Sequence, residues 1–176
     1  MHDLWPATGI CHYARGCTHF YLTCQHCPLL PNSGSDHDIS NRIWYKKQAL
    51  FKTGSIYFVA CSKWPKNQAL QSNLLTGLRL TDIPNPIDTH VFIPQDKKMS
   101  RLRVGLPANK KLILFVSQKV TDERKGMSYF IAAIQKLLEK HPESQQNTGV
   151  VILGVHSGEI ADKLPLPVYP QGYIED

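Results

Sequence analysis

Four of the five cysteines stand close together near the start of the chain, at a spacing that suits metal binding. They follow the pattern C-x5-C-x6-C-x2-C and are Cys11, Cys17, Cys24 and Cys27. A CxxC pair in a tight loop can present two thiolates to one tetrahedral ion, and a second pair completes a closed structural zinc site. The pair formed by Cys24 and Cys27 has this spacing, whereas the first pair is wider and therefore less specific.

Three states of these cysteines are compatible with the sequence. They can bind zinc, with His12, His19 and His26 as substitute ligands, they can form disulfide or redox pairs, or they can be free thiols. The opening residues MHDLW do not form a secretory signal. We therefore expect a cytosolic protein, in which stable disulfides are disfavoured. A metal held by four thiolates would be structural, because no coordination position stays open for a substrate.

A second candidate site is the turn DERKG at residues 122–126, which lies between a predicted strand and a predicted helix. The first turn of a helix offers unpaired amides and the positive end of the helix dipole, and both favour an anion. Gly126 lets a ligand approach the backbone, and Lys125 adds a mobile charge of the kind that binds diphosphates. A solvated turn with no ligand is the alternative explanation.

A third candidate is His2, which is followed by Asp3. A histidine and a carboxylate at the end of a strand could serve in acid–base chemistry or bind a sugar hydroxyl. Two adjacent lysines, Lys46 and Lys47, lie on a predicted helix that carries aromatic residues. They could touch an anionic membrane, although two charges are few for that purpose.

The composition excludes several classes of protein. The chain has 176 residues, of which 42% are hydrophobic and 19% charged, so disorder is not expected. No apolar run approaches the roughly 18 residues that a membrane-spanning helix needs. The formal charge of +6 follows from 20 basic and 14 acidic side chains. This excess favours an anionic partner but does not separate nucleic acid, membrane surface and phosphorylated substrate.

Hydrophobic periodicity predicts an α/β protein with parallel sheets. We expect strands at 55–61, 78–83, 111–116 and 150–155, and helices at 43–51, 62–75 and 126–138. The strand at 111–116 should be covered on both faces, because it is a short, continuous apolar run. Residues 84–107 are rich in proline and charge, and we interpret them as a connection with one short helix near 96–106. The predicted division is therefore 1–83, 84–107 and 108–176.

Several segments in the same order resemble the family 4 (group 1) glycosyltransferases of the GT-B fold. Residues 84–92, PNPIDTHVF, resemble the linker P-N-G-I-D-x-x-x-F, and ACSKW at 60–64 resembles the turn x-x-S-x-W. The segment from 122 onward resembles R-K-G-x-x-x-L-I-x-A. The opening HDLWPATGIC, together with the later cysteines, is similar to a bacterial polysaccharide-synthesis subgroup.

The resemblance implies an internal fragment with parts of two Rossmann-like domains, incomplete at both ends. Residues 1–83 would be the C-terminal part of the acceptor-binding domain with its Cys-rich loop, 84–107 the interdomain linker, and 108–176 the first part of the nucleotide-sugar-binding domain. It implies retaining transfer of a sugar from a nucleotide diphosphate to a saccharide or lipid-linked acceptor, with no catalytic cofactor. Lys125 would contact the donor diphosphate, Arg124 would be a second anion contact beside Gly126, and His2 would face the transferred sugar.

The sequence departs from the family pattern in three places. Pro86 replaces the linker glycine, Ser117 and Gln118 replace a Gly-Arg pair, and no glutamate has an acidic residue eight positions on, as the family's E-x7-E pair requires. We therefore expect this chain alone to be inactive. We also expect a cytoplasmic protein, with peripheral contact at the inner face of the membrane.

The alternative is a small zinc-containing module that binds nucleic acid. Such a module needs a basic surface near the metal. Arg15 is the single lysine or arginine between Met1 and Asn41. We therefore expect nucleotide-sugar and acceptor partners and no nucleic acid.

Overall fold

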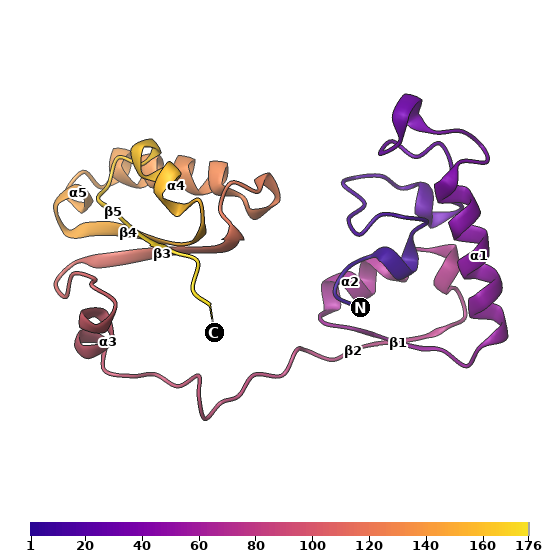
Figure 1. Cartoon of the computed structure of the whole chain (residues 1–176), viewed down its shortest axis with the longest axis horizontal. Helices are drawn as coiled ribbons and strands as arrows, with labels where there is room; N and C mark the ends of the chain where they lie inside the picture. Colours follow the sequence, from indigo (N-terminus) through magenta and orange to yellow (C-terminus); the bar gives the residue numbers. More distant parts are fainter. Residues whose placement is uncertain (176) are drawn as a thin grey trace. The chain divides into compact units, whose positions relative to one another are not determined.

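The computed structural model describes residues 1–175, and the chain divides into two compact units, Met1–Phe92 and Ile93–Asp176. The boundary lies inside the predicted connection at 84–107. Every residue from Ile83 to Met99 is exposed. Figure 1 shows this stretch as an extended segment that contains little regular structure.

The first unit is built on two helices and two parallel strands. These are α1 (Ile39–Thr53), β1 (Tyr57–Ala60), α2 (Lys63–Ala69) and β2 (Arg79–Asp82), and the register pairs Tyr57 with Arg79. The backbone nitrogen of Met1 donates to the carbonyl of Val59, and the amide of Cys61 donates to the carbonyl of Met1 at 3.1 Å. Met1 thus bonds to the residues on both sides of Ala60, which is the hydrogen-bond pattern of a parallel strand pair. Met1 therefore lies beside the carboxyl end of β1.

The segment before α1 contains only short 3-10 turns, at Trp5–Ala7, His19–Tyr21 and Pro31–Ser33. It is nevertheless part of the hydrophobic core. Phe20 and Cys24 pack with Trp44 and Phe51 of α1, and the cluster also contains Ala7, Ala69, Leu74 and Leu75. Burial of this apolar surface holds the irregular segment against α1.

The second unit is a three-stranded parallel sheet with its main helix on one face (Figure 1). Its elements are α3 (Lys97–Arg103), β3 (Lys111–Lys119), α4 (Met127–Lys140), α5 (Ser144–Asn147), β4 (Thr148–Val155) and β5 (Val168–Gly172). The strand order is β3-β4-β5. Side chains of α4, including Met127 and Ile134, pack on Val150 and Ile152 of the central strand. The predicted α/β class with parallel sheets is confirmed.

Two sequence predictions about these elements were wrong. The strand at 111–116 was expected to be covered on both faces, but β3 lies at the sheet edge and Leu114 and Val116 are 58% and 57% exposed. The helix at 62–75 ends at Ala69, and residues Asn73–Leu75 form a separate 3-10 turn. Ser62 occupies the N-cap position, but its side chain makes no capping hydrogen bond to the described residues.

No helix in the described range 1–175 is both long enough and apolar enough to span a bilayer. Lys46 and Lys47 were considered as a pair that could touch a membrane, but Lys47 is not accessible for such a contact. Its side chain is only 5% exposed, because it points into the first unit. Lys46 is exposed on the same helix.

Candidate functional site

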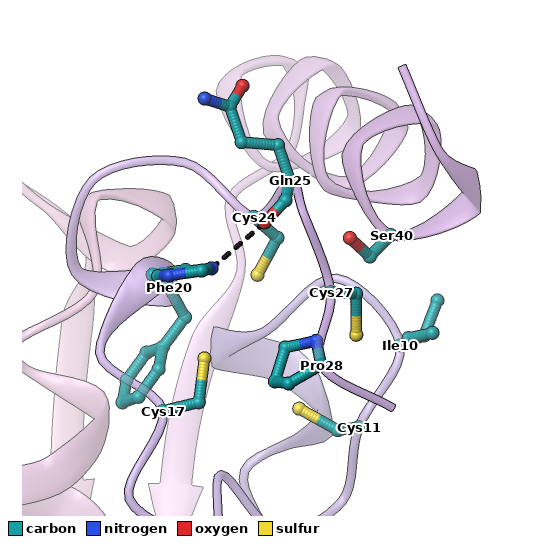
Figure 2. Close-up of a pocket in the computed structure, with 10 residues that line it drawn as sticks. Ile10, Cys11, Cys17, Phe20, Cys24, Gln25, Cys27, Pro28 and Ser40 are labelled. Carbon is teal, nitrogen blue, oxygen red and sulfur yellow. Dashed lines mark hydrogen bonds between the residues drawn. The ribbon is translucent and has the colours of Figure 1, made fainter. Parts of the chain in front are cut away.

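The structure brings all four N-terminal cysteines to one small cavity in the first unit, here called the cysteine cavity. Figure 2 shows their thiols pointing toward the same space. Cys24 and Cys27 are 7% and 8% exposed, and Cys11 and Cys17 are half-buried. The other lining residues are Ile10, His19, Phe20, Gln25, Pro28 and Ser40. The sequence-predicted group is therefore also a spatial group.

The start of α1 fixes the backbone of the Cys24–Cys27 turn. Asp38 accepts a hydrogen bond from the amide of Cys27 at 3.0 Å and caps the helix by accepting from the amide of Asn41 at 3.0 Å. The side-chain amide of Asn41 donates to the carbonyl of Cys24 at 3.0 Å. Burial opposes ionisation of Asp38, but hydrogen bonds from Ser40 and three backbone amides outweigh it and hold its pKa well below the usual range. Asp38 is therefore ionised at neutral pH.

Lys47 places a buried positive charge beside the cysteine cavity. Its ammonium donates to the carbonyls of Trp5, Thr8 and Gly9 at 2.6, 2.9 and 2.9 Å, and it lies 3.5 Å from the centre of the Trp5 ring. Burial lowers the pKa of Lys47 to about 8, although nearby Cys24 and other acidic groups favour the charged form. The side chain is therefore mainly charged at pH 7.

The thiols of Cys24 and Cys11 have raised pKa values in this arrangement. Burial raises the pKa of Cys24 to about 11, the other three cysteines contribute in the same direction, and a hydrogen bond from the amide of Gly9 opposes them. Burial also raises the pKa of Cys11. As the side chains stand, no group of three or more His, Cys, Asp or Glu within residues 1–175 could hold a metal ion. The cavity gathers the thiols but does not form a finished metal site.

Two of the three histidines proposed as substitute ligands bind carboxylates instead. His12 Nδ1 lies 2.6 Å from Asp3, and His26 Nε2 lies 2.8 Å from Asp36. Only His19 lines the cysteine cavity, and its Nδ1 lies 2.9 Å from the carbonyl oxygen of Gln25. The cysteines are thus the main candidate ligands.

His2 lies just beyond the carboxyl end of β1, because it follows Met1. The side chain of His2 is exposed. The neighbouring carboxylate of Asp3 does not belong to a His2–Asp3 pair, since it accepts from the amide of Trp5 at 2.8 Å and bonds His12. Ligands of open α/β sheets bind outside the carboxyl ends of parallel strands, and His2 is in such a position.

The turn at 122–126 follows the carboxyl end of β3 in the second unit. Arg124 forms a two-point pair with Asp122, with distances of 3.0 Å from Nε and 2.6 Å from the terminal nitrogen. These bonds lower the pKa of Asp122 to about 2. Lys125 is exposed, and no salt bridge found among the described residues involves it. Of the two predicted cations, Lys125 is the one available to a ligand.

The backbone of this turn leads directly into α4, whose first turn is not capped by any described side chain. Gly126 has φ +78°, a left-handed conformation that favours glycine, and α4 begins at the next residue. No side chain of the described residues caps the first turn of α4. The leading amides of α4 and the ammonium of Lys125 are therefore the donors that this turn could offer to an anion.

Comparison with known proteins gives a short list of relatives. No protein-family model matches the chain, and no solved structure gives a significant match. The D-inositol 3-phosphate glycosyltransferase of Nocardiopsis dassonvillei is 32% identical over 80 residues, which is 46% of this chain and 18% of that protein. The protein of the same name from Acidothermus cellulolyticus is 31% identical over 80 residues, 46% of this chain and 17% of that protein.

The chain is similar to glycosyltransferases. The matched part spans less than a fifth of the length of either relative. The similarity supports the predicted kinship with glycosyltransferases, and the α/β fold with parallel sheets agrees with it. The bacterial polysaccharide-synthesis subgroup stays a prediction.

Proposed function

We propose that this chain is part of a retaining glycosyltransferase of the GT-B class, which transfers a sugar from a nucleotide diphosphate to a saccharide or lipid-linked acceptor in polysaccharide synthesis. The observation that carries the proposal is the turn at 122–126, where Lys125 is exposed and the first turn of α4 has no capping side chain among the described residues. The similarity to two glycosyltransferases supports it.

The charge of this turn suits the chemistry of sugar transfer. When the bond between the sugar and the diphosphate breaks, negative charge grows on the leaving diphosphate. A cation and helix amides placed beforehand stabilise that charge most when it is greatest, which lowers the barrier rather than only tightening substrate binding. In this proposal Lys125 and the first amides of α4 bind the diphosphate, and His2 contacts the transferred sugar.

Replacing Lys125 with alanine should weaken binding of a nucleoside diphosphate about five- to tenfold, because one charge-assisted contact is lost. We expect wild-type affinity for uridine or guanosine diphosphate in the millimolar range, measured by the amide NMR shifts of residues 123–130. Lys136→Ala, which removes an exposed charge from α4 beyond its first turn, should bind as the wild type does. Unchanged shifts in the wild type at saturating diphosphate, or equal affinity of Lys125→Ala, would contradict the assignment.

Replacing Asp122 with asparagine should have the opposite effect. Asp122 is ionised at neutral pH because its pKa is lowered to about 2, so it repels an anion at the turn and holds Arg124. Asparagine keeps an oxygen that can accept from the amide of Arg124 but removes the charge. We expect diphosphate binding to tighten about threefold at low ionic strength and this gain to shrink in salt. Weaker binding by Asp122→Asn in the same titration would show that Asp122 organises the site rather than opposing the ligand.

Two further expectations belong to this proposal. The chain alone should show no sugar transfer, because its sequence contains no E-x7-E pair. A cytoplasmic location with peripheral contact at the inner membrane face is the second expectation, and the burial of Lys47 removes one of the two lysines that suggested such contact. The comparisons give no support to the alternative of a nucleic-acid-binding module.

A further inference from the structure

We propose that the four cysteines of the cysteine cavity bind one zinc ion as a structural tetrathiolate site in the first unit. This proposal does not depend on the proposed sugar transfer, because the turn at 122–126 belongs to the other unit. Four sulfur ligands at one centre favour zinc or iron in tetrahedral geometry and leave no position for a substrate.

The folding of the N-terminal segment is the first argument for the site. Cys11 and Cys17 precede and Cys24 follows the 3-10 turn at His19–Tyr21, and Cys27 ends the CxxC pair. All four thiols nevertheless point into one cavity (Figure 2). The fifth cysteine, Cys61, follows β1 and is not among the residues that line this cavity. Apolar packing alone would not require every cysteine of the segment, and no other one, at the same place.

The hydrogen bonds around the cavity suit thiolate ligands. The amide of Gly9 donates to Cys24 Sγ at 3.1 Å. The backbone of Cys24 and Cys27 is fixed by Asn41 and Asp38, which are outer partners of the kind that orient metal ligands. A Cβ at Gly9 would lie 2.3 Å from the carbonyl oxygen of Ser40. Glycine is therefore required for the close approach to Ser40, which places the amide of Gly9 within hydrogen-bonding distance of Cys24 Sγ.

The charge of the surroundings also suits the site. Zn²⁺ with four thiolates has a net charge of 2 − 4 = −2, which is unfavourable in a half-buried place without a nearby cation. Lys47 supplies that cation. Its ammonium bonds the carbonyl of Thr8, and the N–H at the other end of the same peptide group, that of Gly9, bonds Cys24 Sγ. The peptide dipole thus connects the buried ammonium to the sulfur.

Zinc binding requires the thiols to move closer together, since no finished metal site is present among the described residues. The loop between Cys11 and Cys17 can allow this movement. It lies outside helices and strands and reverses through two left-handed residues, Arg15 with φ 48° and Gly16 with φ 83°. Ligand distances of about 2.3 Å can then be reached while Cys24 and Cys27 keep their anchors. Metal binding of this kind contributes directly to folding.

Metal analysis of the whole chain tests the proposal. We expect about one zinc ion per chain after desalting in reducing buffer, and release of that ion as about four thiols are titrated with a mercurial reagent. Cobalt substitution should give the intense visible bands of tetrahedral cobalt thiolate. Absence of zinc after growth and refolding with zinc, iron as the bound metal, or disulfides among the four cysteines in the reduced preparation would each overturn the proposal.

Variants separate ligation from folding. Cys24→Ser should lose most of the zinc, whereas Cys61→Ser, the matched control outside the cavity, should retain it. Cys17→His replaces one zinc ligand with another type, so it should still bind cobalt but with shifted and weaker sulfur charge-transfer absorption. Full zinc retention in Cys24→Ser, or a cobalt spectrum of Cys17→His identical to that of the wild type, would overturn the assignment of these ligands. None of these outcomes bears on diphosphate binding at Lys125.

Discussion

Replacing Lys47 with methionine should lower the free energy of unfolding of the first unit by about 2–4 kcal/mol. Methionine fills a similar volume, so the loss is mainly that of hydrogen bonds. The ammonium satisfies the carbonyls of Trp5, Thr8 and Gly9 in a place where the side chain is 5% exposed. Without it, these carbonyls lose a charged donor, and each buried acceptor left unpaired is costly. Methionine avoids the cost of burying a charge, which offsets part of this loss of stability. It does not replace the three hydrogen bonds of the ammonium.

Tryptophan fluorescence measures this effect in the first unit alone. All three tryptophans, Trp5, Trp44 and Trp64, lie within Met1–Phe92. A urea titration followed by fluorescence therefore reports the unfolding of that unit. Lys46→Met is the matched control, because Lys46 is the neighbouring lysine on the exposed face of α1, and its removal should change stability by less than about 0.5 kcal/mol. Equal midpoints for the two variants would show that the buried ammonium contributes no stability.

The same lysine shows what the sequence can reveal. Trp44, Lys47 and Phe51 recur at helical spacing, and all three are buried. Lysine at a position in an apolar stripe is therefore a detectable signal of a buried, paired charge. The partners were not predictable, because Trp5, Thr8 and Gly9 lie in a segment without periodicity. Tertiary packing alone places their carbonyls around the ammonium.

The predicted boundaries of helices and strands were wrong where long-range contacts determine them. The helix predicted at 43–51 begins at Ile39, because Asp38 caps it and the polar residues Ser40 and Asn41 are buried by bonds to Asp38 and Cys24. Strand β5 was not predicted, because its sequence VYPQG contains proline and glycine. It forms at a sheet edge, where a residue without an N–H is tolerated.

The candidate sites were predicted to different depths. Spacing predicted the four cysteines as a group, and the structure brings them to one cavity. The order of a strand, a charged turn and an apolar helix predicted a ligand contact at Lys125, and this stays a prediction. The pairing of Arg124 with Asp122 could not be predicted from their proximity in the sequence, because charged turn residues are usually solvated. The role of Asp38 was not predicted from the sequence, yet this side chain connects Cys27 to the start of α1.

Replacing Gly154 with alanine should destabilise the second unit by about 2–4 kcal/mol. Gly154 has φ +138°, which side-chain-bearing residues rarely adopt, and an added Cβ would lie 1.8 Å from the carbonyl oxygen of Ser117. The neighbouring backbone would have to move, because the obstacle is main chain. This contact lies where the register of β3 and β4 shifts between Val116 and Lys119, just before the turn that holds Lys125. The variant should therefore loosen both the sheet and the proposed diphosphate site.

Hydrogen exchange measured by mass spectrometry suits this unit, which contains no tryptophan. A loss of about 3 kcal/mol corresponds to roughly 100-fold faster exchange of the most protected amides of β3 and β4. Gly158→Ala is the matched control, because a Cβ at Gly158 meets no heavy atom within 4 Å. Exchange in α1 of the first unit should be the same in both variants if the two units unfold independently. Wild-type protection of β3 and β4 in Gly154→Ala would contradict this prediction. It would mean that the two strands separate at this point at little cost, and that the close approach of Gly154 to Ser117 does not hold the carboxyl end of the sheet together.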